Sequence, residues 1–236
     1  MCKECGCGVT DISEKKAIEV FEDILKYNQF QAKHNREHFE EYKIYAITIM
    51  GAPGSGKTTL LEKTLDLLKN KYRIGVIEGD LETERDAERI RQKGVPVYQI
   101  ITGSACHLDA ALVHKAMHHL PLDKIDLLFV ENIGNIVCPS NYELGTHLNV
   151  TLLSVPEGED KPKKYPLIFK VSDVIIITKI DLLPYFDFNL EKVKEQIKKI
   201  NPHSHVISLS AKTGEGFEKW IKLIETNINE YRQRLS

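Results

Sequence analysis

Short apolar runs alternate with amphipathic stretches from about residue 42 to the end of the chain. The runs are rich in β-branched residues, which indicates strands that are buried on both faces. We expect strands at 43–50, 73–77, 95–100, 125–130, 150–155, 173–178 and 205–209, and helices at 57–70, up to 91, 107–119, 190–200 and 216–235. Crossovers of this length join parallel strands. The pattern therefore predicts an α/β fold, a mostly parallel sheet with helices on both faces.

A separate amphipathic segment precedes this alternation. Four apolar residues recur in it at helical spacing, namely Ile18, Phe21, Ile24 and Leu25. Ser13 is a residue type that caps helices, so residues 11–41 are predicted to form a helix that packs against the flank of the domain. The first ten residues are rich in Gly and Cys. The predicted organisation is a tether (1–10), a helix (11–41) and one α/β domain (42–236).

The composition is that of an ordinary globular chain. Its 236 residues are 42% hydrophobic and 28% charged, with a formal net charge of −2. These values exclude a disordered chain and a protein that binds polyanions by bulk charge, so no nucleic-acid partner is expected. No apolar run follows the amino terminus, and no stretch approaches the ~20 apolar residues that cross a bilayer. We therefore expect no membrane association and a cytoplasmic location.

A phosphate-binding loop lies between the first predicted strand and the helix that follows it. The segment from Gly51 to Thr58 matches G-x-x-x-x-G-K-[ST] at every position. Its glycines let successive backbone N–H groups face a phosphate, while Lys57 supplies charge to the β- and γ-phosphates and Thr58 offers its hydroxyl to Mg²⁺. The predicted phosphate-binding residues are Gly51, Gly54, Ser55, Gly56, Lys57, Thr58 and Thr59.

Two later segments favour GTP over ATP. Thr178-Lys179-Ile180-Asp181 follows an apolar run in the pattern of the guanine-recognition element [NT]KxD. The Asp181 carboxylate can accept from two guanine donors that adenine lacks, and the Lys179 stem can lie over the base. Ser210-Ala211-Lys212 follows the last predicted strand, and a backbone N–H there can meet the guanine O6. Together these segments predict a GTPase.

Two carboxylates are candidates for the Mg²⁺ and γ-phosphate side. Glu131 follows the most apolar run, and Asp80 lies in Glu78-Gly-Asp80, just after the second predicted strand. Since ligands of parallel sheets bind at the carboxyl ends of strands, we expect Thr58, Asp80 and Glu131 to hold Mg²⁺ and Lys57, Asp80 and Glu131 to serve hydrolysis. The Gly134 N–H can reach the γ-phosphate. The alternative is that both acids are solvated or capping residues, and the absence of an evident arginine finger predicts slow hydrolysis.

Cys106, His107 and Cys138 form a second constellation. Cys106 and His107 are expected to open the 107–119 helix, and Cys138 follows Glu131 closely, so the three side chains can converge on Zn²⁺ or Ni²⁺. The alternative is two buried cysteines and a capping histidine. His114 and His118 would share a helix face with His107. A solvated histidine stripe is favoured there over another metal site.

A third cysteine group lies at the amino terminus. Cys2, Cys5 and Cys7 form C-x-x-C-x-C in a segment that has no core to bury them. Three thiolates, joined by the Cys2 α-amino group if Met1 is removed, suit a four-coordinate Ni²⁺ or Zn²⁺. A redox-active or incidental cluster is the alternative.

In combination these motifs resemble the hydrogenase nickel-incorporation GTPases, the HypB family. The matching segments are C-x-x-C-G-C, GAPGSGKTT, EGD, the run at Thr102–Asp109, ENIGNIVCP, TKID and S-x-K. The resemblance covers nearly the whole chain. It implies a SIMIBI-class P-loop GTPase that dimerises when GTP is bound, with Cys106, His107 and Cys138 at the dimer interface as a zinc or nickel site and the amino-terminal cysteines as a tight nickel site.

The resemblance also implies partners and a role. The partners would be a small zinc-binding accessory protein and the large subunit of a [NiFe]-hydrogenase, and the cofactors would be GTP or GDP, Mg²⁺, Ni²⁺ and Zn²⁺. This chain has no long His-rich tract, so nickel delivery is favoured over storage. The alternatives are a nickel-delivery GTPase for urease, a P-loop kinase acting on a small molecule, and a nickel-binding protein without enzymatic activity.

Overall fold

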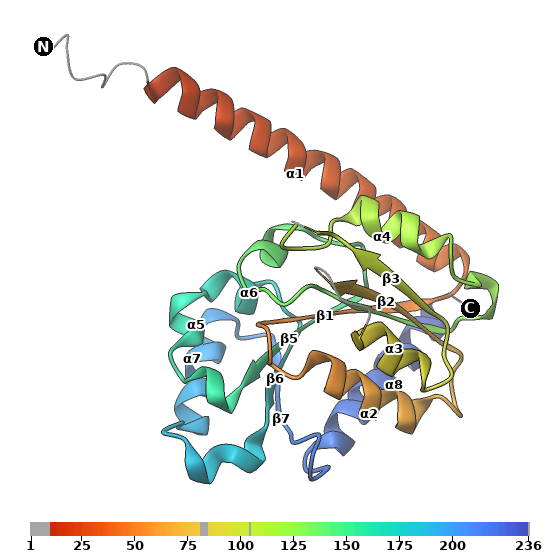
Figure 1. Ribbon diagram of the computed structural model, residues 1–236, viewed down its shortest axis with the longest axis vertical. Coiled ribbons are helices and arrows are strands. Elements are labelled where there is room, and N and C mark those ends of the chain that lie inside the picture. Colours follow the sequence, from red (N-terminus) through yellow and green to blue (C-terminus); the bar gives the residue numbers. More distant parts are fainter. Residues whose placement is uncertain (1–9, 81–84, 104, 236) are drawn as a thin grey trace, which may run out of the picture.

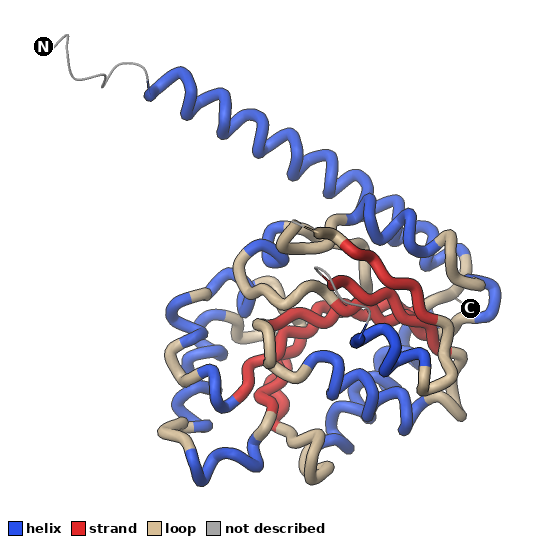
Figure 2. The backbone as a smooth tube through the Cα atoms, viewed as in Figure 1, coloured by secondary structure: helices blue, strands red, loops and turns tan. Residues whose placement is uncertain are grey.

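Within residues 10–80, 85–103 and 105–235, which the computed structural model describes, seven parallel strands form one sheet (Figures 1 and 2). The strands are β1 (Tyr45–Gly51), β2 (Ile74–Asp80), β3 (Val97–Ile101), β4 (Leu127–Glu131), β5 (Leu148–Ser154), β6 (Val174–Thr178) and β7 (His205–Ser208). Their order is β3-β2-β4-β1-β5-β6-β7, and each neighbouring pair is parallel. The predicted α/β fold is confirmed.

Helices cover both faces of the sheet. They are α1 (Thr10–Glu41), α2 (Lys57–Leu68), α3 (Arg85–Arg91), α4 (Ala110–Met117), α5 (Lys161–Lys164), α6 (Pro166–Lys170), α7 (Leu190–Ile200) and α8 (Phe217–Arg234). On one face, α2, α3 and α8 pack on a core cluster that includes the fully buried Trp220. On the other face, α1 and α4 cover β2, β4 and β1, while α6 and α7 cover β5 and β6. Burial on both faces explains why the central strands are continuously apolar.

Two predicted boundaries were wrong in ways that affect the candidate sites. The second strand extends to Asp80 instead of ending at residue 77, because β3 pairs with it from Val76 to Asp80, beyond the pairs that it forms with β4. The helix expected at 107–119 begins at Ala110, since the Asp109 side chain accepts a hydrogen bond from the Leu112 N–H at 2.7 Å and caps it. Cys106 and His107 therefore lie in a loop before α4, not in its first turn.

The carboxyl-terminal half of α1 docks on the domain through a face that is half polar and half apolar. Asn28, Ala32, Asn35 and Phe39 are all buried there. Asn28 donates to the Glu143 carbonyl at 2.8 Å and accepts from the Ala110 N–H at 2.9 Å. Gly145 packs so closely on this helix that an added Cβ would lie 2.2 Å from the Ala32 carbonyl oxygen. Backbone contacts thus position this half of the helix.

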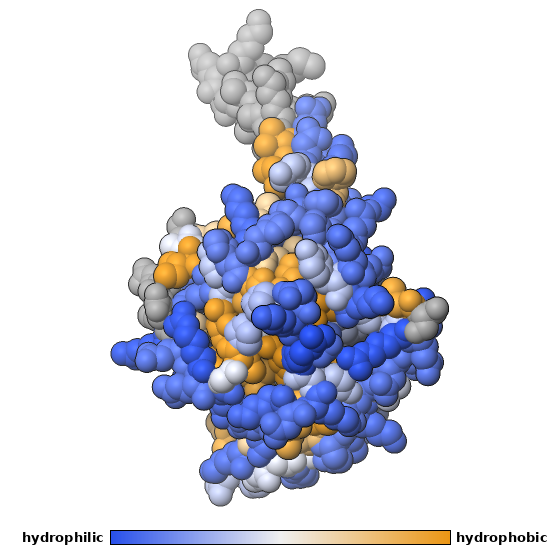
Figure 3. Space-filling model, turned by 90° about the vertical axis from the view of Figure 1, so that its right-hand side faces the viewer, coloured by the Kyte–Doolittle hydropathy of each residue, from blue (hydrophilic) through white to orange (hydrophobic). Residues whose placement is uncertain are grey.

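The preceding half of α1 projects away from the domain, contrary to the expected packing of its apolar stripe (Figures 1 and 3). Ile18, Phe21 and Ile24 are 58%, 47% and 48% exposed. The helix already begins at Thr10, so Ser13, expected to cap it, lies within it. Among the described residues no helix combines the length and the apolar character that a bilayer span requires.

Candidate functional site

The phosphate-binding loop joins the carboxyl end of β1 to the amino end of α2. Gly51 ends the strand and Lys57 begins the helix. Gly54 and Gly56 have φ angles of +75° and +96°, a left-handed conformation that residues with a Cβ rarely adopt. Gly56 is the N-cap of α2 and offers no side chain to cap the first turn. The N–H groups of that turn therefore remain available to an anion.

A cavity of about 460 Å³ opens in front of this loop. Its walls contain most of the predicted phosphate and magnesium residues, namely Gly54, Gly56, Lys57, Thr58, Thr59, Asp80, Glu131, Gly134 and Lys179. The other two loop residues, Gly51 and Ser55, are buried and do not line the cavity. The Lys57 Nζ lies 3.3 Å from the Gly51 carbonyl oxygen, so its charge already sits inside the cradle. Gly134 packs against Pro53, where an added Cβ would lie 3.1 Å from the Pro53 Cα.

The end of β6 fixes the outer side of the phosphate-binding loop. The Thr178 hydroxyl donates to the Ser55 carbonyl at 2.6 Å, and the Lys179 Nζ donates to the Gly54 carbonyl at 2.7 Å. Lys179 itself has a φ of +59°, an uncommon conformation for a residue with a side chain. Because these two carbonyls are held outward, the loop presents its N–H groups to the cavity without rearrangement.

A second cavity, of about 290 Å³, adjoins the first, because Gly56, Thr59 and Lys179 line both. Its walls bring together Asp181, Ala211 and Lys212 from the two predicted base-recognition segments. Leu60, Leu182 and Leu209 supply the apolar surface. Ser210 is buried behind this wall, and its hydroxyl donates to Asp181 Oδ1 at 2.6 Å. The cavity pair thus has a polar end for phosphates and a mainly apolar end for a base.

Glu131 lies at the base of the first cavity and is only 2% exposed. It accepts a hydrogen bond from the Thr58 hydroxyl at 2.8 Å. Burial raises the pKa of Glu131 to about 7, although the Lys57 charge and the Thr58 hydrogen bond act in the opposite direction. The solvated-acid alternative is therefore wrong for Glu131, while Asp80, half-buried, lies at the cavity wall.

Glu78 is a site residue that the sequence reasoning missed. It is paired in register with Glu131 on the adjacent strand, lines the same cavity and is also 2% exposed. Burial and the Glu131 charge raise its pKa well above the usual range. One oxygen of each carboxylate has no hydrogen-bond partner among the described residues. Two buried carboxylates and a hydroxyl form a hard oxygen donor set that fits Mg²⁺. The available signal was its position two residues before Asp80, directly after the strand predicted at 73–77.

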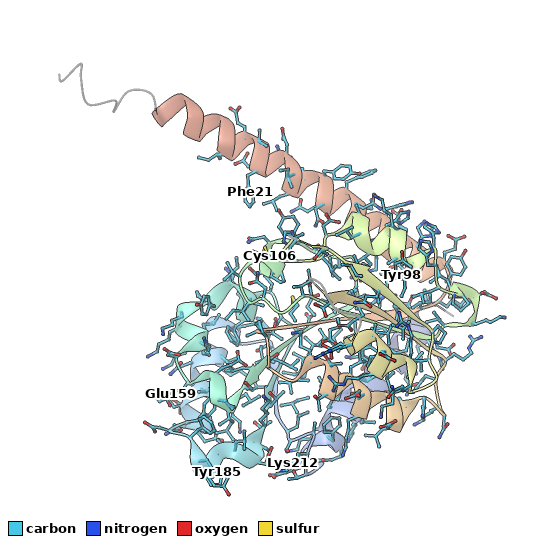
Figure 4. The ribbon with its side chains drawn as sticks, viewed as in Figure 1. Phe21, Tyr98, Cys106, Glu159, Tyr185 and Lys212 are labelled. Atoms are coloured by element: carbon cyan, nitrogen blue, oxygen red, sulfur yellow. The ribbon has the colours of Figure 1, made fainter. Side chains whose placement is uncertain are left out.

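Cys106, His107 and Cys138 converge in two loops above the sheet edge, where Figure 4 labels Cys106. Their ligand atoms all lie within 4.8 Å of one another. The sulfurs of Cys106 and Cys138 are 2.9 Å apart, and His107 Nδ1 is 3.7 Å from the Cys106 sulfur. Cys106 is exposed, and Cys138 and His107 are half-buried, so the alternative of two core cysteines is wrong.

The thiols of this cluster can exchange their protons for a metal ion, and its imidazole can bind the ion without losing a proton. The Cys138 thiol raises the pKa of Cys106, and burial lowers the pKa of His107, so its imidazole is neutral at pH 7. Thiolates bind Zn²⁺ at about 2.3 Å in a tetrahedron, which requires the sulfurs to separate to roughly 3.8 Å. A bound ion would therefore open the cluster and release the thiol protons.

Two asparagines connect the cysteine cluster to the nucleotide cavity. The Asn132 side chain accepts from the Leu108 N–H at 3.0 Å, and Asn132 directly follows Glu131. Asn135 pairs with Gly51 of the phosphate-binding loop through a backbone bridge, and its side chain donates to the Cys106 carbonyl at 3.1 Å. Both residues lie in the segment between Glu131 and Cys138. This segment contacts the phosphate-binding loop and the metal-ligand loop at once.

The remaining candidate ligands are the two histidines of α4 and the three amino-terminal cysteines. His114 and His118 do not share a helix face with His107, because His107 precedes α4. They face α1 instead. The amino-terminal candidates Cys2, Cys5 and Cys7 lie outside the described residues.

The fold and the paired cavities define the class of protein. A phosphate-binding loop after the central strand of a parallel sheet, with a second cavity lined by the segments that follow β6 and β7, is the arrangement of a P-loop nucleotide-binding protein of the SIMIBI class. Residues 45–208 match the family described as "CobW/HypB/UreG, nucleotide-binding domain". The chain belongs to this family and, within it, to the HypB hydrogenase maturation factors.

Individual relatives agree with this assignment. The hydrogenase maturation factor HypB of Escherichia coli K12 is 44% identical over 223 residues, which are 94% of this chain and 77% of the relative. The hydrogenase/urease maturation factor HypB of Helicobacter pylori J99 is 43% identical and covers 92% of this chain and 91% of its own. The crystal structure of Helicobacter pylori HypB in complex with nickel superposes with a TM-score of 0.83 at 41% identity, covering 86% and 96% of the two chains.

Proposed function

We propose that this chain is a GTP-hydrolysing nickel metallochaperone that delivers nickel during maturation of a [NiFe]-hydrogenase. The observation that carries the proposal is the segment from Glu131 to Cys138. It lines the phosphate cavity at one end, supplies a metal ligand at the other and is tied to both loops through Asn132 and Asn135. The bound nucleotide and the geometry of the metal site would then both depend on this one short segment.

Guanine recognition is assigned to the second cavity. Asp181 would accept from N1–H and the exocyclic amine of guanine, with its orientation held by Ser210. The stem of Lys179 would cover the base, and the backbone at Ala211 and Lys212 would reach O6. ATP offers no donor pair to Asp181 and would leave a charge unpaired.

Hydrolysis is assigned to residues around the first cavity. Thr58, Asp80 and Glu131 would hold Mg²⁺, with Glu78 beside them, and the ion supplies positive charge to the phosphate oxygens when bound. Lys57 binds the β- and γ-phosphates, and the Gly134 N–H faces the γ-phosphate. Arg89 lines the cavity but donates to Glu62 and Asp86. With this guanidinium engaged, we expect slow intrinsic hydrolysis.

Nickel would be the cargo of this protein, and two sites would bind it. Cys106, His107 and Cys138 provide two thiolates and one imidazole, a donor set suited to Ni²⁺ or Zn²⁺, and leave one position of a tetrahedron open. A ligand from a second copy of the chain or from a receiving protein can fill it. Cys2, Cys5 and Cys7 of the tether (1–10) would form the tight nickel site.

Dimerisation is proposed to link the sites. GTP would close a homodimer of the 42–236 domains, change the geometry at Cys106 and Cys138 and so release nickel. By linkage, nickel must then shift the affinity for GTP by the same factor. The partners would be a small zinc-binding accessory protein, for which the exposed half of the 11–41 helix is available, and the hydrogenase large subunit.

Urease is a second candidate recipient. The Helicobacter pylori relative carries both functions in its name, "Hydrogenase/urease maturation factor HypB". Supplying the nickel-loaded chain and GTP to apo-urease and to an apo-hydrogenase large subunit, in parallel, would distinguish them. The proposal expects activation of the hydrogenase, and activation of urease alone would replace it.

Replacing Cys138 with alanine tests the coupling. In a background with Cys2, Cys5 and Cys7 changed to serine, exchanging GDP for a non-hydrolysable GTP analogue should alter Ni²⁺ affinity by about 5–150-fold. Cys138→Ala should weaken Ni²⁺ binding at least about tenfold and abolish the nucleotide effect, because the shared segment then ends without a ligand. Competition with a chromophoric chelator measures both quantities.

The matched control is Asn141→Ala, an exposed position in the same loop. It should keep both the affinity and the nucleotide effect. If Cys138→Ala retained the full nucleotide effect on Ni²⁺ binding, the proposed coupling would be wrong.

A further inference from the structure

Four histidines face one another where α1 packs on α4. His34 and His38 are one turn apart on α1, and His114 and His118 are one turn apart on α4. Ligand nitrogens of His34, His38 and His114 all lie within 4.8 Å of one another. The ring centroids of His38 and His118 are 5.9 Å apart, and those of His114 and His118 are 4.8 Å apart. Two helices thus contribute one imidazole pair each to a single cluster.

Apolar packing does not account for this cluster. The side chain of His34 is 48% exposed and His118 is exposed as well, so the rings bury little surface. The buried Nδ1 of His38 has no hydrogen-bond partner among the described residues. A cation that binds neutral imidazoles would satisfy all four rings.

Asn35 fixes which nitrogen of His114 can bind a metal. The Asn35 side-chain nitrogen donates to the carbonyls of Ala110 and Leu144, at 2.8 and 3.0 Å, so its Oδ1 must be the atom that faces His114. That oxygen lies 3.1 Å from His114 Nδ1. Since Oδ1 can only accept, Nδ1 carries the proton, and Nε2 presents a lone pair. Metal-binding histidines are oriented in this way, by a hydrogen bond to the nitrogen that does not bind.

The separation of the coordinating nitrogens matches a tetrahedral site. His114 Nε2 and His118 Nε2 are 3.3 Å apart. A tetrahedron with metal–nitrogen bonds of about 2.0–2.1 Å has edges of roughly 3.3–3.4 Å. This pair already has the spacing of two ligands, whereas the ligand nitrogens of His34 and His38, which lie within 4.8 Å of each other and of His114, must move closer to complete the shell.

We propose that His34, His38, His114 and His118 bind one divalent transition-metal ion of the zinc or nickel type between α1 and α4. Four neutral imidazoles without a thiolate suit these borderline cations. The site is separate from the cysteine cluster and does not depend on the proposed function. Asn35 bonds to His114, to α4 and to the loop before β5, so the ion would clamp α1 on the domain and set the direction of its projecting half.

Zinc binding by the full chain with all five cysteines changed to serine tests this site. We expect one equivalent of Zn²⁺ to bind, measured by competition with a chromophoric chelator. Adding His34→Ala and His118→Ala, two exposed positions whose loss leaves the core intact, should weaken binding by at least about 10–100-fold. The matched control removes the exposed pair His203 and His205, also by alanine substitution, and should bind as the parent does.

Cobalt gives an independent readout. Co²⁺ in the five-serine chain should show the visible absorption of a tetrahedral site, and the spectrum should be lost only in the His34/His118 variant. The proposal is overturned if the five-serine chain binds no Zn²⁺. It is also overturned if the His34/His118 variant binds with the parent's affinity, or if both double variants lose affinity equally, which would indicate scattered surface histidines.

Discussion

Replacing Asp181 with asparagine will lower the affinity for GDP by roughly 10²- to 10⁴-fold and raise the affinity for xanthosine diphosphate. Asp181 would accept two hydrogen bonds from guanine, and bonds to a charged group contribute about 1.5–3 kcal/mol each. Ser210 donates to Asp181 Oδ1, so an asparagine keeps its carbonyl oxygen at that position and turns its NH₂ toward the base. That group opposes the guanine amine but matches the carbonyl oxygen of xanthine.

Equilibrium titration with fluorescent GDP, xanthosine diphosphate and ADP measures the change. Asp187→Asn, an exposed position beyond the same segment, is the matched control and should bind GDP normally. Unchanged GDP affinity in Asp181→Asn would contradict the assignment of guanine to the second cavity. Tight binding of ADP by the parent chain would favour the small-molecule kinase alternative instead.

Replacing Lys57 with alanine will reduce the rate of GTP hydrolysis by about 10²- to 10³-fold, the effect of losing one preorganised charge at a transition state. The Lys57 Nζ is the cation inside the phosphate cradle. The neighbouring cations cannot replace it, because Lys179 donates to the Gly54 carbonyl and Arg89 donates to Glu62 and Asp86.

Single-turnover release of phosphate from GTP at saturating protein gives the rate. Lys219→Ala, an exposed position on α8, serves as the control and should leave the rate unchanged. Thermal unfolding of the Lys57 variant, measured alongside, checks that the lost rate does not come from a loss of folded protein. A hydrolysis rate within twofold of the parent would show that phosphates do not bind in this loop.

The parts of the structure that the sequence predicted depend on local signals. The phosphate-binding loop was identifiable because its glycines and lysine occur at fixed spacing between an apolar run and a helix. The central strands were identifiable because burial on both faces requires continuous apolar residues, as in β4. The parallel α/β fold and the resemblance to HypB, which depend on these signals, are confirmed.

The parts that the sequence did not predict depend on contacts between distant residues. Two of the four buried residues on the docking face of α1 are asparagines, so hydrophobic periodicity selected Ile18, Phe21 and Ile24 instead, which are exposed. Glu78 was predicted to follow the second strand, and only the register of β2 with β4 places it beside Glu131. The histidines of α4 were compared with His107 along the sequence, whereas their neighbours in space are on α1.

The link between the nucleotide cavity and the cysteine cluster was only partly predictable. The short distance in sequence from Glu131 to Cys138 suggested coupling. The structure adds two asparagine side chains that contact the metal-ligand loop, Asn132 at Leu108 and Asn135 at Cys106, and a backbone bridge from Asn135 to Gly51 of the phosphate-binding loop. Side-chain hydrogen bonds of this kind leave no periodic pattern in a sequence.

Sedimentation velocity on the metal-free full chain tests the central claim most directly. The chain would be measured with GDP and with a non-hydrolysable GTP analogue, each with and without Ni²⁺. The account predicts a monomer with GDP, a dimer with the GTP analogue, and a monomer–dimer equilibrium that shifts when Ni²⁺ is added. A monomer under all four conditions, together with Ni²⁺ binding that does not respond to nucleotide, would contradict it and leave two independent sites on one chain.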